Sequence, residues 1–382
     1  MADGRRKDPE QALEGLVPVL LKTLAMLELA QRHLHPPALP GIVRELAPLA
    51  DELAAATGPF GRVDWPAELH AFRDRLIEAA TAAAGAVSGL AALDRGEDAE
   101  RDPADFIAAI RALRRRVRAL EALYPLAPTL PPLNRFFLER ALPEPAAQVL
   151  VSRLERVAGT ELAAHRGIGH FRNDYRERGG FSLYVPEWTE PGEPLPLIVA
   201  LHGGSGHGRD FLWSWLREAR TRGCMLIAPT SAEQTWSMTG GEDTDAPRLL
   251  AFLEQVRREF PLDPERMLLT GLSDGGTYCL LAGLREDSPF TMLAPFSCML
   301  SPEIVVDGRL ARARDRRIHL VHGALDWMFP VTAARENAAT LEGAGAELVY
   351  REIEDLSHTE AREEHAAVLD RLGVPLPDRA TL

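Results

Sequence analysis

Apolar positions follow one rhythm in the first part of this 382-residue chain and another in the second. Between residues 103 and 124 they recur at steps of three and four, as on one face of a helix: Phe106, Ile110, Leu113, Val117, Leu120 and Tyr124. Similar spacing runs through 12–34, 41–56, 66–92 and 144–157, with Pro, Gly or charged residues at the breaks. Residues 1–158 are therefore predicted to form an all-helical domain.

From about residue 165 short apolar runs alternate with helix-like segments, which predicts a second domain over residues 159–382. The expected strands are "GGFSLYVPE", "LPLIVALHG", "CMLIAPT", "RMLLTG", "TMLAPFSCM", "IHLVHG" and "ELVYREI", and the expected helices are 210–222, 245–260, 275–286, 332–342 and 359–372. We expect Asp245 to cap the second of these helices. Continuously apolar strands alternating with helices are typical of a mostly parallel sheet covered on both faces, an α/β fold.

The composition of the chain argues against some classes of partner and predicts the state of its cysteines. A net charge of −13 argues against nucleic acid and anionic membrane surfaces as partners. The cysteines, Cys224, Cys279 and Cys298, lie in apolar segments without metal-ligand spacing, which predicts buried free thiols in a reducing compartment. Because Pro18 and Lys22 interrupt the apolar run near the N-terminus, we expect neither a signal peptide nor a membrane-inserted segment, and hence a cytoplasmic protein.

One serine stands out within "RMLLTGLSDGGTYCLLAGL", residues 266–284. Ser273 is the centre of a G-x-S-x-G pentapeptide, with an apolar strand before it and a helix-like run after it. By itself the pentapeptide is weak, because small residues surround many turn serines. The strand–turn–helix setting, however, is the one that a nucleophile elbow needs. Ser273 is therefore a candidate nucleophile.

A serine nucleophile requires a base, and a histidine base is usually oriented by an acid. His358 follows the last predicted strand, and Asp326 follows the one before it, so all three side chains are expected at the carboxyl edge of the sheet. Asp355 is a rival acid, but it is only three residues from His358. By contrast, His365 is predicted on a solvent face of its helix. The order Ser273, Asp326, His358 is the order of an α/β-hydrolase triad.

A glycine-rich turn follows the strand "PLIVAL". Backbone N–H groups of Gly203 or Gly204, together with that of Asp274, are predicted to form an oxyanion hole. A phosphate-binding loop is excluded, because such a loop needs a lysine and none follows Lys22. No G-x-G-x-x-G dinucleotide fingerprint can be aligned either. Hydrolysis by a serine, a histidine and an acid needs neither a cofactor nor a metal, so none is expected. Four residues either line an apolar pocket or fill the core: Trp236, Trp327, Met328 and Phe329.

Residues 178–372 resemble the α/β-hydrolases, and within them the polyhydroxybutyrate-depolymerase-like and phospholipase/carboxylesterase groups of esterases. The resemblance is carried by "PLIVALHGGSG", "DPERMLLTGLSDGG", "HGALDWMFPV" and "DLSHTE". It implies a Ser273–Asp326–His358 triad. Secreted depolymerases of this kind usually carry signal peptides and disulfides, whereas we expect neither here. The helical half resembles no family that we can name.

The function expected from these features is hydrolysis of small to medium uncharged carboxylic esters through an acyl-enzyme. Three alternatives stay open: a thioesterase, a serine peptidase, and a non-catalytic binding or assembly protein built on the helical domain. For the helical domain we expect either a cap over the site or a surface for homo-oligomer formation.

Overall fold

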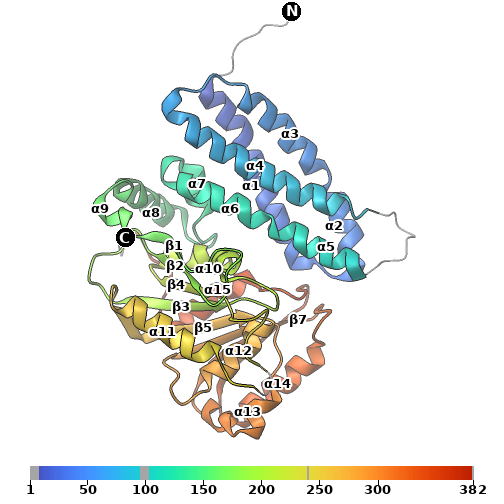
Figure 1. Cartoon of the computed structure of the whole chain (residues 1–382), viewed down its shortest axis with the longest axis vertical. Helices are drawn as coiled ribbons and strands as arrows, with labels where there is room; N and C mark the ends of the chain where they lie inside the picture. The colour runs from blue at the N-terminus through green and yellow to red at the C-terminus, as the bar shows by residue number, and fades with distance from the viewer. Residues whose placement is uncertain (1–7, 95–102, 239–240, 381–382) are drawn as a thin grey trace, which may run out of the picture. The chain divides into compact units, whose positions relative to one another are not determined.

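The structure is a computed structural model, and it describes residues 8–94, 103–238 and 241–380 (Figure 1). The chain divides into two compact units, Met1–Phe136 and Phe137–Leu382. Within the described residues no helix combines the length and the apolar character needed to cross a bilayer.

The first unit is entirely helical where it is described. Its α-helices are α1 (Pro9–His33), α2 (Leu39–Leu46), α3 (Pro48–Gly61), α4 (His70–Ala91), α5 (Pro103–Arg114), α6 (Arg116–Leu123) and α7 (Pro131–Phe136). The segment predicted as one helix over 103–124 is thus two helices that meet at Arg115. Small residues let α4 approach its neighbours closely: a Cβ on Gly89 would lie only 3.0 Å from that of Ala112. The core between these helices consists of Leu, Val, Ile, Ala and Phe side chains.

The second unit is built on an eight-stranded sheet with the order β1-β2-β4-β3-β5-β6-β7-β8. The strands are β1 (Gly167–Phe171), β2 (Phe181–Val185), β3 (Leu195–Leu201), β4 (Met225–Pro229), β5 (Leu262–Leu272), β6 (Met292–Phe296), β7 (Arg317–Gly323) and β8 (Glu347–Ile353). The strands β1, β2 and β4 pair antiparallel, and the run from β4 to β8 is parallel. All seven predicted strands are confirmed. β1 was missed because it is short, contains two glycines and is only partly buried.

Helices cover both faces of this sheet (Figure 1). The helices of the unit are α8 (Glu144–Val157), α9 (Glu161–Ala164), α10 (Gly208–Arg222), α11 (Asp245–Arg257), α12 (Asp274–Gly283), α13 (Pro302–Val306), α14 (Val331–Gly343) and α15 (Arg362–Leu372). Leucines and other apolar residues of α11, α12 and α14 share one core cluster with alternate strand residues. On the other face Trp215 of α10 stacks on His365 of α15, with ring centroids 3.7 Å apart. The mostly parallel, doubly covered α/β fold predicted from the sequence is confirmed.

Residues 137–158 pack with the sheet unit, although their helical spacing led the sequence analysis to group them with the helical domain. The buried Glu139 carboxylate pairs with the Arg222 guanidinium, with Nε–Oε2 and Nη2–Oε1 distances of 2.8 Å. Leu150 and Leu154 of α8 belong to a small cluster against which Trp188 packs. Helical periodicity shows which face of a segment is apolar, but it does not show what that face packs against.

One histidine prediction is wrong. His365 is fully buried, not on a solvent face, and lies between Trp215 and Phe296. Its ring nitrogens are each 3.8 Å from a carboxylate oxygen, of Glu218 and of Glu360 respectively. Polar neighbours in the sequence suggested that His365 faces solvent. In the structure two acidic side chains near it, those of Glu218 and Glu360, are buried with it. The three cysteines are buried and free, as predicted.

Candidate active site

Ser273 occupies a sharp turn between β5 and α12. Its backbone has φ 58° and ψ −121°, a sparsely populated conformation for a non-glycine residue that costs on the order of 1–3 kcal/mol. Two hydrogen bonds fix it: Ser273 N–H donates to the Phe296 carbonyl, and Thr277 N–H donates to the Ser273 carbonyl, both at 2.9 Å. The surrounding structure therefore holds the serine in a strained position at the end of a central strand.

The glycines around Ser273 are needed for steric reasons. A Cβ on Gly271 would lie 2.4 Å from the Gly275 carbonyl oxygen, and a Cβ on Gly275 would lie 2.3 Å from the Leu201 carbonyl oxygen. Both clashes are with backbone atoms, which cannot rotate away. The pentapeptide thus allows the elbow to pack directly against the end of β3.

His358 and Asp326 meet at the same edge of the sheet, in the loops after β8 and β7. His358 Nδ1 lies 2.8 Å from Asp326 Oδ2, and the other carboxylate oxygen accepts the N–H groups of Met328 and Phe329 at 2.9 Å each. The Asp326 side chain is fully buried. Burial raises the pKa of this carboxyl, but the His358 hydrogen bond and charge, the Phe329 N–H and His322 outweigh it, so the pKa is lowered. An ionised carboxylate therefore faces His358.

The structure pairs His358 with Asp326 and leaves the rival Asp355 exposed. The two histidines of β7 have different surroundings, because residues three apart on a strand face opposite sides of the sheet. His322 Nε2 is 3.0 Å from the Phe329 carbonyl oxygen and 3.4 Å from Asp326 Oδ2, whereas His319 Nε2 is 3.3 Å from Glu364. His322 thus adds a contact to Asp326 that the sequence analysis did not anticipate.

The glycine-rich turn after β3 lies against the elbow. A Cβ on Gly203 would be 3.4 Å from Ser273 Cβ, and one on Gly204 would be 2.6 Å from Asp274 Oδ2. Gly206 N–H closes the turn by donating to the Gly203 carbonyl at 2.9 Å. Asp274 is the first residue of α12, where a backbone N–H has no partner within the helix and the helix dipole favours negative charge.

Residues 231–237 connect this turn to the elbow, a role that the sequence analysis did not anticipate although it named Trp236. His202 Nε2 accepts the Ser231 N–H at 3.1 Å, so the ring proton is on Nδ1, 2.7 Å from the Gly203 carbonyl oxygen. Trp236 Nε1 donates to the His202 carbonyl at 2.7 Å, and Thr235 Oγ1 donates to Asp274 Oδ2 at 2.5 Å. Only the polar residues after a strand end hinted at this role.

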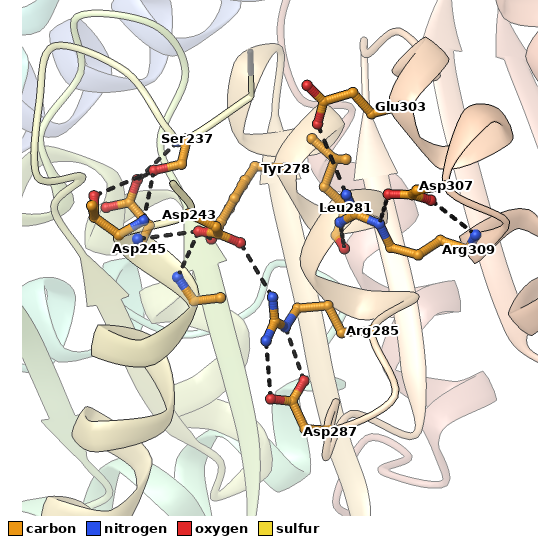
Figure 2. A network of polar contacts seen from close by, with 12 residues as sticks. Ser237, Asp243, Asp245, Tyr278, Leu281, Arg285, Asp287, Glu303, Asp307 and Arg309 are labelled. Atoms are coloured by element: carbon orange, nitrogen blue, oxygen red, sulfur yellow. Dashed lines mark hydrogen bonds and ion pairs between the residues drawn. The ribbon is translucent and has the colours of Figure 1, made fainter. Parts of the chain in front are cut away.

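A polar network secures the far end of the same segment (Figure 2). Tyr278 of α12 donates its hydroxyl to Asp243 Oδ1 at 2.6 Å, and Arg285 lies 3.5 Å from the other oxygen of that carboxylate. Thr244 is the N-cap residue of α11, and the Asp243 side chain before it accepts the N–H groups of Asp245 and Ala246. Asp245 instead accepts the Ser237 N–H and hydroxyl. The capping prediction was wrong, since Asp245 is the first residue of α11 and its side chain points back into the loop.

The four residues predicted to line a pocket or fill the core differ in how far they are buried. Trp236 is buried in the core and stacks on Tyr278, with centroids 5.3 Å apart. Trp327 and Met328 are exposed, at 39% and 47%, and Phe329 is partly buried. The rings of Trp327 and Phe329 stand edge-on to His358, at centroid distances of 6.1 and 5.2 Å.

Within the described residues no group of three or more His, Cys, Asp or Glu side chains has an arrangement that would hold a metal ion. The site consists of protein groups suited to proton transfer and nucleophilic attack: a serine at a strained turn, an imidazole bonded to a carboxylate, and a turn and a helix N-terminus beside the serine.

Residues 246–374 match the sequence profile of the phospholipase/carboxylesterase family. The chain is 27% identical over 162 residues to a bifunctional acetylxylan esterase/xylanase of Neocallimastix patriciarum. The aligned region covers 40% of this chain and 23% of the relative. It is 25% identical over 124 residues to a probable feruloyl esterase C of Aspergillus terreus, covering 31% of this chain and 45% of the relative. The chain thus spans less than half the length of either relative.

Among solved structures, that of esterase PE8 aligns with a TM-score of 0.40 at 23% identity, over 48% of this chain and 96% of that one. The sheet topology and the strand–turn–helix elbow give the second unit an α/β-hydrolase fold, and residues 246–374 within it are similar to the phospholipase/carboxylesterases.

Proposed function

We propose that this protein hydrolyses carboxylic esters through an acyl-enzyme, with Ser273 as the nucleophile, His358 as the base and Asp326 as the acid that orients it. The observation that carries the proposal is the 2.8 Å contact between His358 and Asp326, in loops at the same sheet edge as the strained turn of Ser273. The family match and the two relatives, both named as esterases, support it.

The proposed reaction has two proton-transfer cycles. Since Asp326 holds the proton on His358 Nδ1, Nε2 is available to accept the Ser273 hydroxyl proton as the oxygen attacks the ester carbonyl. The oxyanion that forms would accept hydrogen bonds from the N–H of Asp274 and from that of Gly203 or Gly204. His358 then gives its Nε2 proton to the leaving alcohol. Water, deprotonated by the same nitrogen, attacks the acyl-enzyme, and His358 then returns that proton to the Ser273 oxygen as the bond to the acyl group breaks and the carboxylic acid leaves.

For the substrate we propose an uncharged ester of small to medium size with an apolar part. The exposed Trp327 and Met328 lie in the loop that carries Asp326, and Trp327 stands edge-on to His358. Exposed apolar side chains beside a reacting centre favour an apolar ligand. The net charge of −13 disfavours polyanionic substrates.

The experiment compares the wild type with Ser273→Ala on p-nitrophenyl esters of graded acyl length, with Ser152→Ala, an exposed serine of α8, as the control. We expect turnover by the wild type and the control and none above background by Ser273→Ala. Equal activity of Ser273→Ala and wild type would show that Ser273 is only a turn residue. Parallel assays with thioesters and anilides of the same acyl group separate an esterase from a thioesterase or a peptidase.

For the helical unit we propose one of two roles, a cap over the substrate or a surface for self-association. Deleting residues 1–136 removes the helical unit and keeps Glu139 and α8, which belong to the sheet unit. An unchanged oligomer mass on light scattering would refute self-association, and unchanged kcat and KM would refute the cap.

A further inference from the structure

Arg178 lies in the loop between β1 and β2 and contacts both the glycine-rich turn of the proposed oxyanion hole and the segment 231–237 that connects this turn to the elbow. Its Nε donates to the Glu233 carbonyl at 2.5 Å, and Nη2 donates to the Ser231 hydroxyl at 2.7 Å. Nη1 and Nη2 also reach the Gly206 carbonyl, at 3.3 and 3.2 Å. One guanidinium thus connects the glycine-rich turn to residues 231–234.

The turn that Arg178 holds is strained. Ser205, next to Gly206, has φ 54°, a left-handed conformation that a non-glycine residue keeps only when its surroundings impose it. Ser205 N–H donates to the Gln234 carbonyl at 2.9 Å, so the same two segments are joined a second time at the strained residue. If the contacts from Arg178 and Gln234 were lost, we expect the peptide groups of residues 203–206 to move to a less strained backbone conformation.

The orientation of these peptide groups matters for the proposed chemistry. The Gly206 carbonyl accepts hydrogen bonds from Arg178, and this fixes the orientation of the peptide group at the end of the turn. The contact of the same guanidinium with the Glu233 carbonyl ties that peptide group to the neighbouring segment. A stabilising N–H must point at the place where the oxyanion develops, and a misplacement of about 1 Å can cost roughly 100-fold in rate. A guanidinium suits this task because its planar fork donates in several directions at once, whereas an ammonium is a single point.

We propose that Arg178 is a positioning residue, which holds the glycine-rich turn so that its N–H groups are presented to the oxyanion. The inference rests on the proposed function. It adds a residue that does not touch the reacting atoms and acts through Gly206, Ser231 and Glu233.

The test measures kcat and KM of Arg178→Ala and Arg178→Lys on p-nitrophenyl butyrate. Arg176→Ala, at an exposed arginine two residues earlier in the same loop, is the matched control. We expect Arg178→Ala to lower kcat roughly 10- to 100-fold with KM changed less than about twofold, because binding of the oxyanion weakens more than binding of the ester. Arg178→Lys should recover only part of the loss. The affinity for phenylboronic acid, which forms a tetrahedral adduct with a serine nucleophile, should fall in parallel with kcat.

Two further readouts separate positioning from a general loss of folding. The melting temperature should stay close to that of Arg176→Ala, and millimolar guanidinium should raise the kcat of Arg178→Ala but not that of the control. A kcat for Arg178→Ala within about twofold of the control, or a loss confined to KM with unchanged boronate affinity, would overturn the inference while ester hydrolysis stood. A wild type that neither turns over esters nor binds the boronate would overturn the proposed function, and the inference with it.

Discussion

Asp326→Asn tests the proposed triad most directly, because the surroundings of Asp326 dictate how an asparagine would sit. Oδ1 accepts two backbone N–H groups at 2.9 Å, so the asparagine must place its carbonyl oxygen there or leave two buried donors unpaired. Its NH₂ group then faces His358, where Oδ2 had accepted the Nδ1 proton at 2.8 Å. His358 would have to accept at Nδ1 and carry its proton on Nε2, which is the wrong tautomer for a base toward Ser273.

The expected loss in kcat is about 10⁴-fold, the scale that this tautomer change produces in a serine protease, or about 5.4 kcal/mol of transition-state stabilisation. The assay is kcat and KM on p-nitrophenyl butyrate, with Asp355→Asn, at the exposed carboxylate three residues before His358, as the matched control. If Asp326→Asn kept more than about a tenth of the wild-type kcat, or if Asp355→Asn lost as much, the assignment of the acid would be refuted.

The same variant has a pH signature in its stability. The pKa of Asp326 is lowered in the folded protein, so this group contributes stability that is present above its unfolded pKa of about 3.9 and is lost as the pH falls through the folded pKa. The difference in free energy of unfolding between wild type and Asp326→Asn should therefore be largest near neutral pH and shrink below about pH 4. Urea unfolding from pH 3 to 7 measures it, and a difference independent of pH would contradict the lowered pKa.

Two further substitutions probe the steric fit of the elbow and the buried ion pair that joins residues 137–158 to the sheet unit. Gly275→Ala should destabilise the protein by about 1–3 kcal/mol or more, because the new Cβ would lie 2.3 Å from the Leu201 carbonyl oxygen. Its control is Gly343→Ala, whose Cβ would meet nothing within 4 Å and which should be neutral or stabilising. Thermal unfolding measures both. Glu139→Ala should lower the free energy of unfolding in urea by roughly 3–5 kcal/mol, since it removes a buried carboxylate from the buried Arg222 guanidinium. The control is Glu144→Ala, at an exposed carboxylate. Equal effects of the two substitutions would refute the importance of the buried pair.

Much of the proposed catalytic arrangement could be predicted from the sequence because it depends on local patterns. A continuous apolar run predicts a buried parallel strand, and the carboxyl ends of such strands meet at one edge. Ser273, Asp326 and His358 each follow such a run, so their approximate places were predictable without any knowledge of contacts. The glycines of the elbow were also predictable, because the steric demand arises within a few residues.

The remaining features depended on which segments pack together in three dimensions. Polar neighbours in the sequence placed His365 in solvent, but long-range packing buried it against Trp215. Helical spacing grouped residues 137–158 with the helical domain, whereas the Glu139–Arg222 pair, 83 residues apart, joins them to the sheet unit. Arg178 gave no sequence signal at all, because an arginine in a polar loop is ordinary until its acceptors are known.

The sequence by itself thus determined most of the strands and helices and the residue types available for chemistry at the strand ends, because hydrophobic periodicity and backbone sterics act over a few residues. Only the tertiary structure decided which carboxylate faces His358, which loop steadies the glycine-rich turn and which charges are buried. Those outcomes depend on contacts between segments that lie tens of residues apart, such as Asp326 and His358 at a separation of 32.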